Sequence, residues 1–286
     1  LRYENHSVDF ASVTTNDTLG YIADPSAIKS SQDDNLWGGK LTLEHDLGSS
    51  QTVFASVTRG YKAGGANNGT FNLPGDPLTY DKETLWNYEL GLRSSWLDGR
   101  IESQLTIFYL DREDAQLRDS AGAGGFFRYF TSNQGDAEHY GLEAEATWYV
   151  AEDWTASVSL GLLESELDAT GNDISNTPSY TYSARLDYRP AEGLFAGIEV
   201  VGSDEYYESN SLTNREQRES YNVVNASFGY RWDHWTITLW SKNLFDEDYQ
   251  ERVFFFDNFD PNGLGAQRYE AAAAPRTFGV TANYSW

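Results

Sequence analysis

The sequence predicts an all-β protein, a transmembrane antiparallel β-barrel, and three observations support that prediction. Apolar and polar residues alternate with a period of two along many segments, the connections between segments are alternately short and long, and Trp and Tyr gather near the short connections. The alternation gives each strand one apolar and one polar face. Tight turns at one end and long loops at the other are typical of outer-membrane barrels.

The alternation is clearest in the segment from 86 to 96. Trp86, Leu90 and Trp96 fall on one face there, whereas Glu89 and Arg93 fall on the other. Counting such segments in order along the chain, we predict twelve strands, at residues 1–12, 36–47, 51–63, 84–97, 101–117, 138–150, 154–166, 178–189, 194–206, 220–232, 235–246 and 275–286. Most are about 10 to 13 residues long, whereas strands of soluble proteins are most often about 5 to 6.

The connections follow the same order. The short ones are rich in turn-forming residues and lie at 48–50, 98–100, 151–153, 190–193 and 233–234. The long ones carry many Gly, Asn, Asp and Ser residues and lie at 14–35, 64–83, 118–137, 167–177, 207–219 and 247–274. Amphipathic rings near the short turns indicate a girdle at a membrane boundary, formed by Trp96, Trp148, Trp154, Tyr188, Trp232, Trp235 and Trp286.

The amino-acid composition excludes several classes of protein. The 286 residues carry a formal net charge of −24, include no Cys, and have a mean hydropathy of −0.58. Disulfide scaffolds, zinc–thiolate sites and cysteine nucleophiles are therefore excluded. No stretch approaches the roughly 18 to 20 apolar residues of a spanning helix, and the negative field disfavours nucleic acid as a partner. A soluble antiparallel sandwich or barrel would alternate too, with its apolar face inward, and is the alternative fold.

Several segments resemble the barrel of TonB-dependent outer-membrane receptors when they are taken as a set. They occur in the order found in that family and cover nearly the whole chain: RGYKAGG (59–65), ETLWNYELGLRSSWLDGR (83–100), NQGDAEHYGLEAEATW (133–148), KNLFDEDY (242–249) and PRTFGVTANYSW (275–286). The resemblance implies a 22-stranded barrel around an N-terminal plug domain, which imports scarce nutrients with energy from the TonB complex. It also implies a Gram-negative outer membrane as the location, with lipid and lipopolysaccharide around the wall.

Twelve strands are about half of such a barrel. We therefore expect residues 1–286 to be its C-terminal portion, without the plug and the first strands, and the chain carries neither an initiator Met nor a signal peptide. A complete 12-stranded barrel is the alternative. The last strand, by its alternation to an aromatic end, resembles the signal read by the barrel-assembly machinery, carried by Phe278, Val280, Ala282, Tyr284 and Trp286.

Catalytic and metal-binding motifs are absent from the sequence. The four His residues have no metal-site spacing and no GxSxG motif occurs, so we predict neither an enzyme nor a cofactor or metal site. An outer-membrane hydrolase and a passive porin remain as alternatives. Four glutamates on the polar face are expected to bond Arg93, Arg185 or the plug: Glu89, Glu102, Glu143 and Glu145.

Ligand recognition is expected in the long loops, where aromatic clusters lie beside arginines. The candidates are Phe126, Phe127, Arg128, Tyr129, Tyr206, Tyr207, Arg252, Phe254, Phe255, Phe256 and Phe259. Such clusters suit an anionic, often aromatic iron–siderophore complex or a stacked sugar. We expect an iron–siderophore complex first, because the resemblance implies that this ligand class dominates the family. Cobalamin, oligosaccharides and other metal chelates remain alternative ligands. Alternatively, these rings belong to the upper aromatic belt or to strands that extend above the membrane.

Overall fold

The computed structural model describes residues 1–12, 28–67, 77–123, 126–208, 216–256 and 267–286, and the described residues form twenty strands and no helix. Twelve of the strands form one antiparallel sheet, and each of them pairs with the next of these twelve along the chain. In sheet order these are β1 (Arg2–Ser12), β2 (Ile28–Asp46), β3 (Gln51–Lys62), β6 (Glu83–Trp96), β7 (Ile101–Glu113), β10 (Ala137–Ala151), β11 (Trp154–Leu167), β12 (Tyr180–Tyr188), β13 (Gly193–Ser203), β16 (Tyr221–Trp232), β17 (Trp235–Lys242) and β20 (Thr277–Tyr284). The all-β prediction and its antiparallel sheet are confirmed.

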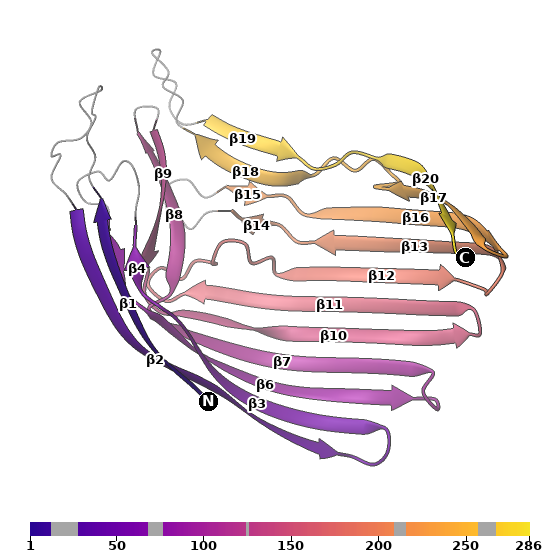
Figure 1. The fold of residues 1–286 in the computed structure, drawn as a ribbon, viewed down its shortest axis with the longest axis horizontal. Coiled ribbons are helices and arrows are strands. Elements are labelled where there is room, and N and C mark those ends of the chain that lie inside the picture. Colours follow the sequence, from indigo (N-terminus) through magenta and orange to yellow (C-terminus); the bar gives the residue numbers. More distant parts are fainter. Residues whose placement is uncertain (13–27, 68–76, 124–125, 209–215, 257–266) are drawn as a thin grey trace.

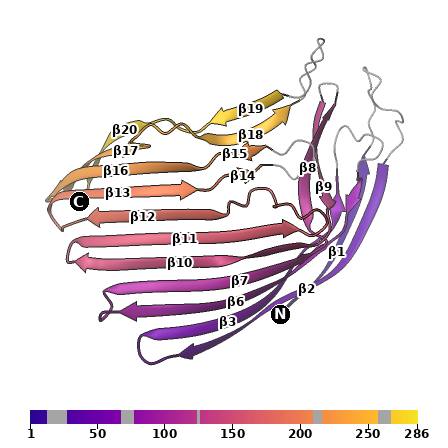
Figure 2. The same ribbon diagram turned by 180° about the vertical axis from the view of Figure 1, so that it is seen from behind.

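The other eight strands form four small hairpins within the long connections. They are β4 (Gly65–Ala66) with β5 (Thr79–Tyr80), β8 (Gln116–Ala123) with β9 (Phe126–Asn133), β14 (Tyr206–Tyr207) with β15 (Gln217–Arg218), and β18 (Gln250–Phe256) with β19 (Gln267–Ala272). All four lie toward the end of the sheet opposite the short turns (Figures 1 and 2). Short and long connections therefore separate to opposite ends, as the sequence predicts.

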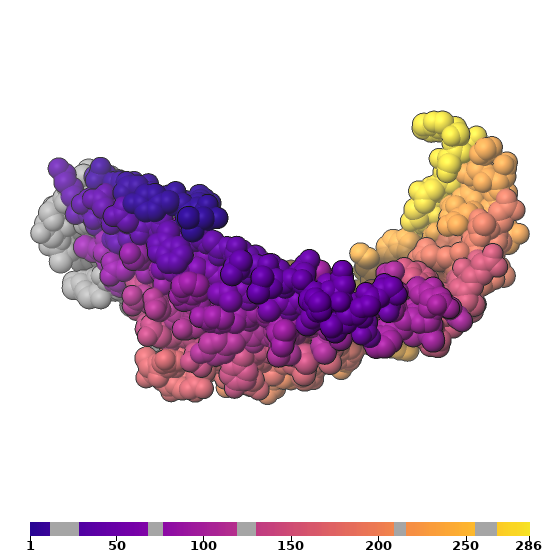
Figure 3. All heavy atoms as spheres, turned by 90° about the horizontal axis from the view of Figure 1, so that it is seen from below, coloured from indigo at the N-terminus to yellow at the C-terminus, as the bar shows by residue number. Residues whose placement is uncertain are grey.

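The sheet is strongly curved, with the N-terminal strands at one end of the arc and β20 at the other (Figure 3). Polar side chains such as Arg93, Gln104 and Ser159 line its hollow. The opposite parity carries large apolar side chains that stay exposed, among them Leu41, Leu43, Leu90, Leu105, Ile107, Val158, Leu160, Ile198, Phe228 and Leu239. An apolar outer face and a polar inner face are what a barrel wall in lipid requires.

Two rows of rings border the apolar face. Near the short turns, Trp154 packs on Tyr188 with ring centroids 4.8 Å apart, and Trp235 packs on Tyr284 at 5.1 Å. Toward the loop end a second row runs from Trp37 through Trp86 and Tyr88 to Tyr109, with centroids 6.0 to 6.4 Å apart. The first row matches the predicted girdle, and the second lies where an upper belt belongs.

Some strand ends differ from the predicted ones. β2 begins at Ile28, eight residues before the predicted start, and β7 ends at Glu113 rather than at 117. The early part of β2 reads IKSSQDDN and has no apolar parity, so period two cannot reveal it. Asp114, with φ of 54°, turns the chain out of β7 and into the hairpin β8–β9.

Two lumen-face arginines pair with other carboxylates than the four glutamates expected, whose contact with a plug stays a prediction. Arg93 pairs with Glu44 at 3.0 Å, and Arg185 pairs with Asp187 and, at 3.6 Å, with Glu199. Of the four glutamates named above, Glu89 instead accepts from Ser56 at 2.5 Å and lies 3.6 Å from Lys40. The error arises because side-chain partners across a sheet depend on strand register, which alternation within one strand does not specify.

The KNLFDEDY segment closes the loop end of β17 around one buried amide. Asn243 is 3% exposed and has φ of 51°; its side chain donates to the carbonyls of Glu247 (2.8 Å) and Ala274 (3.3 Å) and accepts from the Glu247 amide (2.8 Å). Its own backbone amide donates to Asn225 of β16 at 3.1 Å. Asn243 thereby joins three chain segments and satisfies backbone groups that would otherwise be unpaired.

Replacing Asn243 by alanine is expected to lower the free energy of unfolding by about 2 kcal/mol, because the three hydrogen bonds of a buried side chain are lost together. Asn176 provides the matched control, since it also has a positive φ (62°), but within the described residues its side chain makes only one long hydrogen bond, of 3.4 Å, to Ser175 Oγ. Urea unfolding in lipid vesicles would separate the two, and equal losses for N243A and N176A would show that only the backbone conformation matters.

Candidate functional site: hairpins at the loop end and the ion network beneath them

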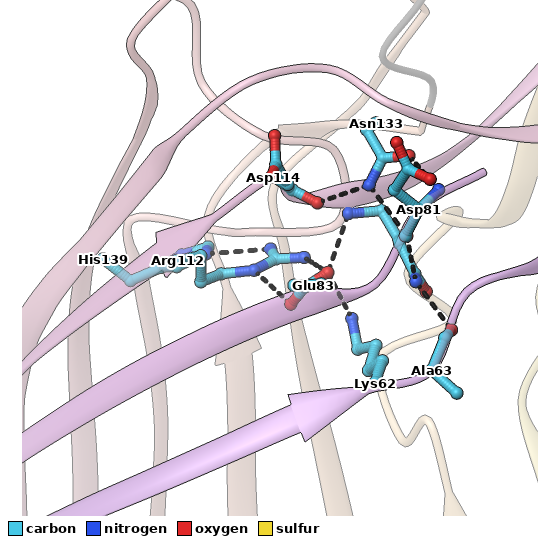
Figure 4. Close-up of polar contacts among 9 residues, drawn as sticks. Lys62, Ala63, Asp81, Glu83, Arg112, Asp114, Asn133 and His139 are labelled. Carbon is cyan, nitrogen blue, oxygen red and sulfur yellow. Dashed lines mark hydrogen bonds and ion pairs between the residues drawn. The ribbon is translucent and has the colours of Figure 1, made fainter. Parts of the chain in front are cut away.

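A buried ion network lies where β3, β6, β7 and β10 reach the loop end (Figure 4). We call Lys62, Glu83, Arg112 and His139 the rim network. The Glu83 carboxylate is fully buried and accepts from Arg112 Nε and Nη2, both at 2.9 Å, and from Lys62 Nζ at 3.0 Å. The backbone amide of Gln116 donates to the same carboxylate at 2.7 Å. A bidentate guanidinium and two further donors give this buried anion the partners it needs.

Arg112 also binds His139 on the next strand. Its Nη1 lies 3.2 Å from His139 Nε2, and the two residues are 9% and 8% exposed. Because the guanidinium can only donate, His139 Nε2 must accept here. The network therefore extends across four neighbouring strands of the wall.

Amide side chains connect this network to the hairpins above it. Gln116 Nε2 donates to the carbonyls of Ala63 (2.8 Å) and Asp81 (2.9 Å). Asn133 donates to the carbonyls of Asp81 (3.0 Å) and Asp114 (2.8 Å) and accepts from the Asp81 amide (2.7 Å). The bases of hairpins β4–β5 and β8–β9 are thus fixed to the wall through backbone groups.

The glycines of the RGYKAGG motif allow this close packing. Gly64 donates its amide to Asp34 Oδ2 at 2.8 Å, and a Cβ at this position would lie 2.8 Å from the Tyr80 carbonyl oxygen and 2.6 Å from Gln32 Nε2. A larger residue would push the chain before β4 away from β2 and from β5.

A second group of side chains lies on and beside the other two hairpins. We call Tyr206, Arg218, Tyr221, Tyr249, Arg252, Phe254 and Tyr269 the hairpin cluster. Arg218 Nη1 donates to the Tyr206 hydroxyl at 2.5 Å, and its guanidinium lies 5.4 and 5.5 Å from the ring centroids of Tyr206 and Tyr221. Tyr221 in turn stacks on Tyr249 at 4.7 Å, which extends the cluster from β16 to the chain before β18.

The hairpin β18–β19 repeats this arrangement of a cation on rings. Arg252 lies 5.2 Å from the ring of Phe254, which stacks on Tyr269 at 5.6 Å. Glu208 joins the two hairpins: burial raises the pKa of its carboxyl, while Arg218, Arg252 and the Val253 amide oppose that rise. Burial also raises the pKa of the Tyr206 phenol. A pocket of about 370 Å³ beneath Tyr206 and Tyr221 reaches the polar face of the wall at Ser159, Thr181 and Ser183.

The predicted ligand-binding residues fall at different places. Tyr206, Arg252 and Phe254 belong to the hairpin cluster, and the Tyr207 carbonyl accepts from the Asn176 amide at 2.7 Å. The backbones of Phe126, Phe127, Arg128 and Tyr129 lie in β9 and those of Phe255 and Phe256 in β18, but their side chains, and the whole of Phe259, lie outside the described residues. Their role in ligand binding stays a prediction.

Sequence reasoning missed Arg218, Tyr221, Tyr249 and Tyr269, and it gave Glu83, Lys62 and Arg112 no special role. The motif segments contain several of these residues, but which of them meet depends on hairpin packing. The proposed assembly row of Phe278, Val280, Ala282 and Tyr284 lies along β20, and Trp286 lies two residues beyond its end. Its role in assembly stays a prediction.

Within the described residues, no group of three or more His, Cys, Asp or Glu side chains is arranged to hold a metal ion. In the same part of the chain there is no helix long and apolar enough to cross a membrane.

Fold and site together define the wall of a receptor-type β-barrel, in which a polar face leads to aromatic and cationic hairpins at one end. The model of the family "TonB dependent receptor-like, beta-barrel" matches residues 1–244, and the chain belongs to this family. The relatives in this family are transport receptors and not enzymes, and the chain corresponds to part of such a receptor barrel.

Named relatives agree with this assignment. The chain is 26% identical over 241 residues to the pesticin receptor of Yersinia pestis, covering 80% of this chain and 34% of that protein. It is 25% identical to the ferric-pyoverdine M114 receptor PbuA of Pseudomonas sp. strain M114, covering 73% of this chain and 26% of that protein. The chain therefore spans about a third or less of the length of these relatives.

Solved structures share the fold. The ferric yersiniabactin uptake receptor FyuA from Yersinia pestis superimposes with a TM-score of 0.76 at 23% identity, covering 99% of this chain and 41% of that one. The siderophore receptor PiuA from Acinetobacter baumannii gives a TM-score of 0.71 at 17% identity, covering 92% of this chain and 38% of that one.

Proposed function

We propose that residues 1–286 are the C-terminal portion of an outer-membrane receptor that imports an iron–siderophore complex with energy from the TonB system. The observation that carries this proposal is the hairpin cluster, in which Arg218 and Arg252 lie against aromatic rings although the chain as a whole has a net charge of −24. Ferric siderophores are commonly anionic and aromatic, so guanidinium groups and ring faces suit them. The relatives named for ferric pyoverdine and yersiniabactin support the same ligand class.

Energy coupling and the plug are part of this proposal. A plug domain in the hollow of the wall would meet the polar face lined by Arg93, Gln104 and Ser159, and TonB would act through that plug. A passive porin is the competing function. Uptake of radioactive iron by cells should stop when the TonB gene is deleted, and the purified receptor should be silent in a planar bilayer. TonB-independent uptake with steady ion conductance would favour the porin instead.

The ligand site can be tested with Arg218→Gln in the complete receptor. We expect the dissociation constant for an anionic ferric catecholate or ferric pyoverdine to rise about tenfold, because one charge-assisted contact is lost. Binding is measured by quenching of tryptophan fluorescence over a panel of ferric siderophores.

Arg268→Gln is the matched control on the neighbouring hairpin. Arg268 is similarly placed on β19, but it is already paired with Glu216 at 2.7 Å and with Glu270. Its removal should change affinity less than about twofold. Unchanged affinity in R218Q, or equal losses in R218Q and R268Q, would contradict a specific role for the hairpin cluster.

A further inference from the structure

The apolar face of the wall has a recognisable upper edge. Trp86 belongs to the row of rings toward the loop end, and Trp96 is the last residue of β6, at the short-turn end, where its side chain is exposed. A strand rises about 3.3 Å per residue and tilts by about 35 to 45° in such barrels, so the two rings are separated by roughly 25 Å along the barrel axis. This is about the height of the apolar band of a membrane barrel, which places Trp86 at the level of the outer headgroups.

Arg59 lies at that level on the lipid-facing side of the wall. It pairs with Trp86 across the β3–β6 ladder and shares the parity of Val57, which is among the exposed apolar residues. Its guanidinium carbon is 4.1 Å from the ring centroid of Trp37 and 5.9 Å from that of Trp86, and the guanidinium also donates to the Trp37 carbonyl. Two indole rings on neighbouring strands therefore fix the plane of this cation.

The arginines of the opposite face differ from Arg59 in one respect. Arg93 has Glu44 at 3.0 Å, Arg112 has Glu83 at 2.9 Å and Arg185 has Asp187 as carboxylate partners. In the described part of the chain, no Asp or Glu forms an ion pair with Arg59. A guanidinium on the lipid side needs an anion from its surroundings, because a lone charge facing lipid is unfavourable except near the headgroups.

We propose that Arg59, held between Trp37 and Trp86, binds the phosphate group of a lipid of the outer leaflet. The planar guanidinium presents parallel N–H donors that match two phosphate oxygens, and the indole rings lie against the acyl and sugar region. This lipid site is separate from the ligand site of the hairpin cluster. It depends on the placement of the wall in an outer membrane and not on the identity of the imported ligand.

The test uses the complete receptor with lipid A, the phosphorylated lipid of that leaflet, and with enzymatically dephosphorylated lipid A as probes. Each is titrated into detergent-solubilised receptor, and retained lipid is counted by native mass spectrometry. We expect wild-type receptor to retain the phosphorylated form about tenfold more strongly, and Arg59→Gln to lose most of that preference. Arg59→Lys should keep part of it, since the charge remains while the planar fork is lost.

Arg93→Gln is the matched control, because Arg93 also lies over a ring, that of Phe54 at 4.5 Å, but on the inner face. R93Q should retain lipid A as the wild type does. Equal retention of both lipids by the wild-type receptor would overturn the proposal, and this measurement does not depend on any variant folding. Equal losses of lipid A retention in R59Q and R93Q would overturn it too. Siderophore binding by R59Q is measured in parallel and should be unchanged, so that failure of this proposal is distinguishable from failure of the proposed transport function.

Discussion

Glu83→Gln is expected to lower the free energy of unfolding by about 3 to 5 kcal/mol, the largest effect of any single substitution considered. The glutamine keeps the shape of the side chain but removes the negative charge, so Arg112 stays buried without a counterion. The Gln116 amide and Lys62 also lose a charged acceptor. Urea unfolding of the complete receptor in lipid vesicles, followed by tryptophan fluorescence, measures the loss.

Glu44→Gln is the control for this substitution. Glu44 forms an ion pair of similar length with Arg93, 3.0 Å, but both side chains are about half exposed. Solvent screens such a pair, so E44Q should cost less than about 1 kcal/mol. The double variant E83Q with Arg112→Met should recover part of the loss, since it removes the stranded charge. If E83Q cost no more than E44Q, the rim network would not stabilise the wall.

Glu83 and Glu44 illustrate which features of the site can be predicted from the sequence and which cannot. Glu44 lies on the polar parity of the predicted strand 36–47, whereas Glu83 is the last residue of the predicted loop 64–83, and no local pattern marks Glu83 as the buried one. Burial of Glu83 comes from Arg112 and the Gln116 amide, which belong to another strand and its hairpin. The register between strands and the path of the hairpins determine which glutamate is buried. The alternation of residues within one strand predicts neither of them.

The fold itself could be predicted from the sequence much more completely than the ion network. Twelve long strands were predicted because one face must be apolar wherever a strand crosses lipid, as in β6 and β10. Where the chain rises above the apolar band both faces meet water, so this constraint ends. The polar start of β2 and the two-residue strands β14 and β15 therefore left no periodic signal.

The same limit applies to the candidate site. Tyr206, Arg252 and Phe254 were found from the sequence because rings next to arginines are conspicuous in loops. Arg218 was missed, although its guanidinium contacts both Tyr206 and Tyr221, because its neighbours come from different elements. Composition can nominate residues for a binding surface, but only the packing of hairpins determines which of them meet.

Gly141→Ala is the second substitution with a large expected effect, a loss of about 2 to 3 kcal/mol in the free energy of unfolding. A Cβ on Gly141 would lie 2.0 Å from the Leu162 carbonyl oxygen of β11 and 2.9 Å from the Phe108 ring of β7. Gly141 pairs with Phe108 across the β7–β10 ladder, so the ring occupies the space that a side chain would need. The ring could rotate away, but the backbone of β11 can only move by disturbing the ladder to β10.

Gly161→Ala in β11 separates this steric effect from the general effect of replacing glycine in a strand. Among the described residues, a Cβ there would meet only the Thr181 hydroxyl, at 3.1 Å, which can rotate away. Because alanine restricts the unfolded chain, G161A should be neutral or stabilising by up to about 1 kcal/mol. Urea unfolding in vesicles compares the two variants directly. Equal stabilities of G141A and G161A would mean that β11 can shift at no cost, which contradicts the close packing of Leu162, Gly141 and Phe108 on which the prediction rests.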